Sequence, residues 1–140
     1  MTSWKDMASA IRTRFKTEIA DEYSLEVLYD NAPGDDPSAS ASLTMGLWIR
    51  FSVLPGDSDC QEFGGSKTSR TPGVAVAQIF AQLRQGDRNS LQVADYIKSA
   101  FRHVSADGVI YGTPYVRTVG RDNKWYQINV FCPFYSDDIS

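Results

Sequence analysis

The sequence predicts an α+β fold in which a mainly antiparallel β-sheet packs against two α-helices. Apolar residues recur every three or four positions near the start of the chain and again around residues 90–104, as they do in amphipathic helices. Residues 47–54 and 125–134 alternate between apolar and polar side chains, which is typical of half-buried strands. With 140 residues, 42% hydrophobic and 22% charged, the chain fits one globular domain.

The first helix is expected at residues 3–20. Ser3 and the acidic Asp6 have the spacing of a capping box. One apolar stripe runs along the segment: Trp4, Ala8, Ile11, Phe15 and Ile19. This stripe predicts a helix that packs on a sheet.

A short strand at residues 25–29 is followed by a polar segment at 30–45. That segment holds two prolines, a glycine, three aspartates and a Ser/Ala repeat. Such a composition cannot form a core, so we expect a flexible loop there.

In the strand at 47–54, Leu47 and every second residue after it should face the core, with Trp48 and Arg50 on the opposite face. Pro55-Gly56 ends the strand. We expect a second flexible loop at 56–70, which is polar and has acidic residues in its first part and basic residues in its second part. The sequence leaves open whether this segment forms a hairpin or an interaction surface.

The almost continuous apolar run at 74–83 predicts a central strand that is covered on both faces. Asn89 or Ser90 is the expected cap of the second helix, which runs to about residue 104. Two or three antiparallel strands should follow, at 109–111, 115–119 and 125–134, with a turn at 120–123. The acidic tail at 136–140 is expected to be frayed.

Chemical motifs are lacking throughout the chain. His103 is the single histidine and has no partners at ligand spacing, and no phosphate-binding glycine motif is present. The carboxylate pairs Asp35-Asp36 and Asp57/Asp59 lack EF-hand spacing. We therefore expect no catalytic residue, no cofactor and no metal, with Cys60 and Cys132 as free thiols.

Charge and hydropathy narrow the range of partners. The net charge of −3 and the pI near 5.0 disfavour sequence-independent binding of nucleic acid, so none is expected as a specific partner. The start of the chain lacks the apolar core of a secretory signal, and no apolar run is long enough to cross a bilayer. We therefore expect no membrane partner.

The order of these elements resembles the small bacteriophage tail-terminator family, which includes the lambda-type tail terminator. The similarity extends from about residue 3 to 135, and its anchors are YDN at 29–31, Arg70 with Gly73, Ala94-Asp95 and the stretch 120–134. The resemblance implies a ring, commonly a hexamer, that caps the tail tube, ends tube polymerisation and offers a docking face to the head connector. Its partners would be other copies of itself, the tail tube protein and the head–tail connector protein.

The resemblance also implies where the protein acts and which residues it uses. It would be a structural protein of the virion tail, assembled in the host cytoplasm, with DNA passing through the ring without being held. Trp48 and Trp125 are the candidate apolar anchors between subunits, and Arg50, Arg70 and Arg121 the candidate ion-pair residues. The alternatives are core tryptophans and plain surface arginines.

Two other functions remain open at this point. A head–tail stopper or other neck protein would also form rings. A small-ligand-binding α+β module, with an apolar pocket between sheet and helices, belongs to a different class.

Overall fold

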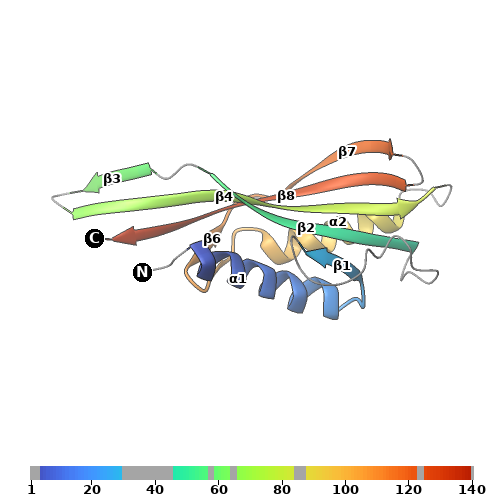
Figure 1. The fold of residues 1–140 in the computed structure, drawn as a ribbon, viewed down its shortest axis with the longest axis horizontal. Helices are drawn as coiled ribbons and strands as arrows, with labels where there is room; N and C mark the ends of the chain where they lie inside the picture. The colour runs from blue at the N-terminus through green and yellow to red at the C-terminus, as the bar shows by residue number, and fades with distance from the viewer. Residues whose placement is uncertain are drawn as a thin grey trace.

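The structure, a computed structural model, describes residues 4–29, 46–56, 59–63, 66–83, 88–122 and 125–139. The N-terminal helix α1 spans Trp4–Phe15 and continues as a π-helical segment, η1, at Lys16–Asp21. The second helix, α2, spans Arg88–Phe101. The α+β prediction is therefore confirmed (Figure 1). The predicted loop at 30–45 lies outside the described residues.

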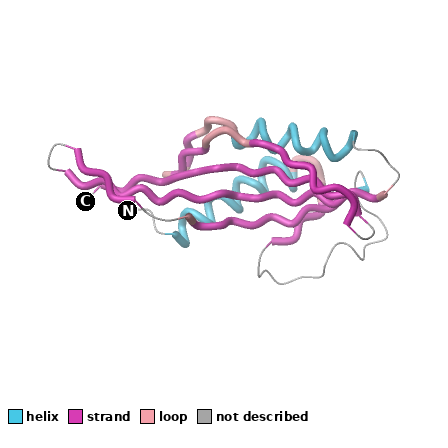
Figure 2. The backbone as a smooth tube through the Cα atoms, turned by 90° about the horizontal axis from the view of Figure 1, so that it is seen from above, coloured by secondary structure: helices cyan, strands magenta, loops and turns pink. Residues whose placement is uncertain are grey.

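The described strands form one mixed sheet of eight strands. In chain order they are β1 (Glu26–Tyr29), β2 (Leu47–Pro55), β3 (Asp59–Phe63), β4 (Ser66–Gln82), β5 (Ser105–Ala106), β6 (Val109–Tyr111), β7 (Tyr115–Asp122) and β8 (Trp125–Ile139). The main path is β1-β2-β4-β8-β6-β5, with β3 paired to β4 and β7 paired to β8. The pair β1/β2 is parallel, and the other pairs are antiparallel. Figure 2 shows these strands side by side.

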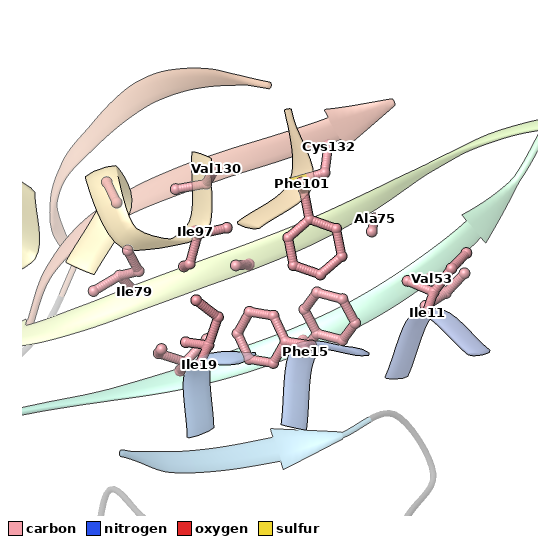
Figure 3. Packing of buried hydrophobic residues seen from close by; sticks show 14 of the residues in the cluster. Ile11, Phe15, Ile19, Val53, Ala75, Ile79, Ile97, Phe101, Val130 and Cys132 are labelled. Carbon is pink, nitrogen blue, oxygen red and sulfur yellow. The ribbon is translucent and has the colours of Figure 1, made fainter. Parts of the chain in front are cut away.

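Both helices pack on the same face of the sheet, around three phenylalanine rings. Phe15 of α1 stacks on Phe51 of β2 with ring centroids 4.0 Å apart, and Phe101 of α2 lies 6.2 Å from Phe15 and 6.5 Å from Phe51. All three side chains are fully buried. The inward side chains of β4 and β8, including Ile79 and Val130, complete the same core (Figure 3). The prediction of a central strand at 74–83 is correct, since β4 lies between β2 and β8. Its two faces differ: α1 and α2 pack on one, whereas on the other Val76 and Phe80 are buried among side chains of the sheet.

An arginine joins the two helices. The Arg14 guanidinium donates two hydrogen bonds to the carbonyl oxygen of Ala100, from Nε at 3.0 Å and from Nη2 at 2.6 Å. It also lies 5.7 Å from the ring centroids of Phe101 and Tyr111. Ala100 is in the last turn of α2, where carbonyl groups lack helical partners and the helix dipole favours a cation. Arg14 thus holds α1 against the end of α2.

The sheet extends beyond the helices as a β-arm. We use that name for β3, residues 66–71 of β4 and residues 136–139 of β8, which pair as three strands. Figures 1 and 2 both show the arm projecting past the N-terminal end of α1. Strands therefore occupy much of the predicted loop at 56–70 and of the predicted frayed tail at 136–140. Pairing with a long central strand overrides the weak local preference of these polar residues for strand.

A close approach of backbone and ring marks the junction between the arm and the body of the sheet. A Cβ on Gly73 would lie 2.5 Å from Cζ of Phe134 and 2.7 Å from the carbonyl oxygen of Leu54. Next to it, the carbonyl oxygen of Pro72 accepts a hydrogen bond from Gly56 N–H at 2.8 Å. In a strand, the N–H and C=O of one residue point to the same side. The missing N–H of Pro72 would therefore point to the gap between the end of β2 and the start of β3, where the sheet needs no donor from this residue.

Local boundaries differ from the predictions in two places. Helix α2 starts at Arg88, so Asn89 and Ser90 lie inside its first turn and do not precede it as caps. Strand β7 continues through the predicted turn at 120–123 up to Asp122, with a register shift between Thr118 and Gly120. Gly120 has φ +99°, a conformation that only glycine adopts readily, which makes a bulge possible there.

We predict that Gly73→Ala lowers the free energy of unfolding by about 2 kcal/mol, because the added methyl must displace the Phe134 ring or the β2 backbone. Urea denaturation of both variants measures this. Gly112→Ala is the matched control, since its Cβ would meet nothing closer than 3.7 Å and should change stability little. Equal losses in the two variants would contradict the account.

Stability should fall in alkaline solution. Burial raises the pKa of Cys132 from 9.0 to about 12, and burial with the Asp21 charge raises that of Tyr29 from 10.0 to about 12. Burial also raises the pKa of Tyr111 to about 12. The unfolded chain loses these protons first, so stability is full below about pH 9 and declines towards pH 12.

The variant Tyr29→Phe tests separately how much Tyr29 contributes to the loss of stability at alkaline pH. The Tyr29 hydroxyl is buried and has no hydrogen-bond partner among the described residues. Its removal should raise the free energy of unfolding by about 1 kcal/mol at pH 7 and make the alkaline decline shallower. Tyr115→Phe, in an exposed ring, should leave stability at pH 7 unchanged. A destabilised Tyr29→Phe protein would show that the hydroxyl has a partner.

Candidate functional site

The face of the sheet opposite the helices is the candidate site, and we call it the outer face. Cross-strand pairs share a face, so the register identifies its members. Trp48 pairs with Phe80, which pairs with Gln127. By register, the members from β2, β4, β7 and β8 are Trp48, Arg50, Ser52, Leu54, Val74, Val76, Gln78, Phe80, Gln82, Tyr115, Arg117, Gly120, Asp122, Trp125, Gln127, Asn129, Phe131, Pro133 and Tyr135. No helix of the described residues covers this face.

An aromatic cluster occupies one end of the outer face. The ring of Trp48 stacks on Phe80 with centroids 4.5 Å apart, and Trp125 meets it edge-on at 6.2 Å. The Arg50 guanidinium lies 5.7 Å from both the Trp48 and the Phe80 ring centroids. Trp48 is only 3% exposed, and its Nε1 has no acceptor among the described residues. The cluster is therefore held within one chain, by ring stacking and cation–π attraction.

A polar row crosses the middle of the outer face. Arg50, Gln78, Asn129 and Arg117 are neighbours in register across β2, β4, β8 and β7. Gln127 donates a hydrogen bond to Asn129 Oδ1 at 2.9 Å. Because the row has a cation at each end, this part of an acidic protein presents positive charge.

A second aromatic pair lies beside this row, at the β7 edge. Tyr115 stacks on Phe131 with centroids 5.1 Å apart, and the Arg117 guanidinium lies 5.4 Å from the Tyr115 ring. Tyr115 is 43% exposed, and Leu54, farther along the same face, is 46% exposed. Exposed rings and apolar side chains next to arginines are typical of protein–protein contact surfaces.

The structure brings three of the predicted interface residues together, because Trp48, Arg50 and Trp125 form one cluster. Arg70 lies apart in the β-arm, where its guanidinium is 4.1 Å from the Tyr135 ring centroid. Arg121 pairs in register with Tyr126, and therefore lies on the face of the sheet that the helices occupy. The bulge before Gly120 shifts the alternation of β7 and moves Arg121 to that side.

Sequence reasoning missed several members of the outer face. Phe80 was hidden in an apolar run that offered no alternation, although it provides the ring on which Trp48 stacks. Arg117 and Tyr115 precede the bulge, so they keep the outer side that Arg121 loses. Residues two positions apart in a strand lie on the same face, so strand periodicity alone would have placed Tyr115 and Arg117 together.

The described residues contain no group of three or more His, Cys, Asp and Glu side chains that could hold a metal ion. Nε2 of the exposed His103 shares a 2.9 Å hydrogen bond with the Thr113 hydroxyl. Cys132 is buried as a free thiol, with its pKa raised to about 12, so it is a poor nucleophile. None of the described helices is long and apolar enough to cross a membrane. The outer face therefore remains the described surface best suited to a partner.

A sheet with helices on one side and exposed rings and arginines on the other is suited to contact with another protein. A family model described as a phage tail terminator protein matches residues 6–134, and the chain belongs to that family. It therefore has a structural role in a phage tail.

Comparison with solved structures agrees on the fold. One solved chain matches with a TM-score of 0.62 at 15% sequence identity, over 94% of this chain and 95% of its own length. No curated protein matches the sequence.

Trp48→Ala should lower the free energy of unfolding by about 3 kcal/mol, because it removes a buried ring from between Phe80 and Trp125. Leu54→Ala, on the same strand and face but exposed, should cost less than about 1 kcal/mol. Urea denaturation of the two variants measures the difference. If Trp48→Ala is nearly neutral, the ring does not belong to the fold of the single chain.

Proposed function

We propose that this protein is a non-enzymatic tail terminator that caps the tail tube as a ring, commonly a hexamer in the family. The ring ends polymerisation of the tail tube protein and gives the head–tail connector protein a docking face. It forms in the host cytoplasm and stays in the virion tail. The family match over residues 6–134 is the observation that carries this proposal.

The outer face supports a role in assembly. Subunits of a ring meet through surfaces that the isolated chain leaves without a partner, and apolar side chains flanked by arginines are suited to such contacts. Here the aromatic cluster supplies a rigid platform, and Arg50 and Arg117 supply charge that a neighbouring subunit can pair. We therefore propose Arg50 and Trp125 as subunit-contact residues, with the buried Trp48 ring supporting both of them.

The remaining predicted interface residues have other places in the proposal. Arg70 is held on Tyr135 in the β-arm, so it would reach a neighbour with the arm and not with the outer face. Arg121, on the helix side of β7, would serve a separate contact, with the tail tube or the connector.

The acidic balance of the chain suits a pore. A net charge of −3 gives little sequence-independent attraction for phosphates, so DNA can pass through the ring without being retained. This requirement concerns the lumen as a whole, and it is compatible with a local basic patch that another subunit covers.

The direct experiment adds the protein to its tail tube protein during tube polymerisation. Substoichiometric amounts should stop growth and shorten the tubes, with a ring visible at tube ends by electron microscopy. Tubes of unchanged length with bare ends would contradict the proposal. A ring found only on the head connector would instead support a neck protein.

Arg50→Glu should abolish this activity while lowering the free energy of unfolding by only about 1 kcal/mol, the size of the lost cation–π contacts. Arg102→Glu is the matched control, since it changes the charge equally at an exposed site just after α2. Tube length and a urea titration on the same preparations give both readouts. Two equally active variants would exclude Arg50 from the contact.

A further inference from the structure

The body of the sheet ends in two strands that each have a single neighbour. Across the body the strands lie in the order β1, β2, β4, β8 and β7, and among the described strands β1 pairs only with β2 and β7 only with β8. Figure 1 shows β1 and β7 at opposite edges of the sheet. The outward N–H and C=O groups of an edge strand are a template for a further strand. Each edge can therefore accept a strand from another molecule.

The two edges lack features that commonly prevent such pairing. Residues 26–29 and 115–122 contain no proline and no lysine, and β7 is regular from Tyr115 to Thr118. On this edge strand Tyr115 and Val119 are 43% and 54% exposed. Exposed apolar side chains on an edge strand favour addition of another strand, so the β7 edge is suited to a partner.

The strand directions would make a head-to-tail pairing of the edges antiparallel. Strand β1 is parallel to β2, and three antiparallel pairs lead from β2 through β4 and β8 to β7. Strand β7 therefore runs opposite to β1. When a second copy continues the sheet in the same orientation, its β1 lies antiparallel to β7 of the first copy, which is the more stable kind of ladder.

The outer-face side chains of the two edges carry opposite charges. Glu26 lies on the outer face at the β1 edge because it pairs with Trp48, and Arg117 lies there at the β7 edge because it pairs with Asn129. Both side chains are exposed, and neither has an ion-pair partner among the described residues. Two β1 edges or two β7 edges would bring like charges together, whereas β1 beside β7 brings unlike charges together.

One register gives each of three positions a suitable partner. It sets an acid opposite a base and apolar side chains opposite apolar or aromatic ones; the pairs are Glu26 with Arg117, Val27 with Val116, and Leu28 with Tyr115. The two valines lie on the helix side of the sheet, where both already pack against the core. A shift of two residues in either direction would separate Glu26 from Arg117, so the side chains favour this register.

We propose that β7 of one copy pairs antiparallel with β1 of the next copy, so that the sheet continues from subunit to subunit. The two edges differ, so the contact is heterologous and repeats until a ring closes. Residues at both rims of the outer face are then buried against neighbouring copies. Glu26 then lies opposite Arg117 of the next copy and diagonal to Arg50 of its own chain. The inference rests on the proposed ring and names the edges that join its subunits.

Charge reversal on each edge tests the pairing. One variant carries Glu26→Arg, a second carries Arg117→Glu, and a third combines both substitutions. Both sites are exposed, so each variant should fold, which a urea titration checks. Arg102→Glu, at an exposed site just after α2, is the matched control. Native mass spectrometry and sedimentation, with tail tubes present and absent, give the concentration at half-assembly.

Each single edge variant should need at least about tenfold more protein for half-assembly than the unmodified chain, since like charges then face each other. The combined variant and the Arg102→Glu control should assemble within about threefold of the unmodified chain. An equal mixture of the two single edge variants should assemble in a 1:1 ratio, because both contacts between unlike copies are then complementary.

A cross-link tests the register directly. A chain with Leu28→Cys and Tyr115→Cys should give covalent oligomers up to the ring size on oxidation, because residues directly opposite each other have Cβ atoms about 5 Å apart. The control chain carries Leu28→Cys and Thr118→Cys. Thr118 is also exposed on β7 but lies on the other face of the sheet, so this chain should give no such series.

Four outcomes would overturn the inference. If Glu26→Arg forms rings normally while Arg117→Glu no longer binds tubes, the β7 edge contacts the tube and the proposed function stands. If Tyr115→Cys alone gives covalent dimers, β7 pairs with itself. If the combined variant and the mixture stay dissociated although folded, while the unmodified protein forms rings, the two edges do not pair. If the unmodified protein forms no ring at any concentration, even on tube ends, the proposed function fails as well.

Discussion

The contact of Phe15, Phe51 and Phe101 is the interaction on which the rest of the structure depends. It joins one ring from each helix to a ring from β2, within about 6.5 Å, and so places both helices on one side of the sheet. Arg14 then fixes the two helices to each other through the Ala100 carbonyl. Since the helices bury one face, the apolar side chains of the opposite face must be covered by one another or by another molecule.

The outer face meets that requirement only in part. Its aromatic cluster stacks internally, which leaves Trp48 only 3% exposed, whereas Tyr115 and Leu54 remain accessible. Rings that are already packed lose little conformational freedom when a partner arrives, so binding to them costs less entropy. The tryptophans thus support the surface, and the charge of the arginines beside them can determine which partner binds.

Much of this arrangement was predictable because strand periodicity is strict. The alternation at 47–54 and 125–134 correctly placed Trp48, Arg50 and Trp125 on one face and Ile128, Val130, Cys132 and Phe134 on the other. The β-arm could not be predicted, since its polar residues become strands only through pairing with β4. The side of Arg121 depends on a bulge at Gly120, and the position of Arg70 depends on Tyr135, which is 65 residues away in the sequence.

We propose that the outer face joins subunits in a ring on the tail tube. Electron cryomicroscopy of the protein bound to tube ends tests it most directly. We expect a ring in which every outer face is buried against a neighbouring copy, with Arg50 and Arg117 paired to acidic residues. A ring whose subunits meet through the helices, with the outer face open to solvent, would contradict it.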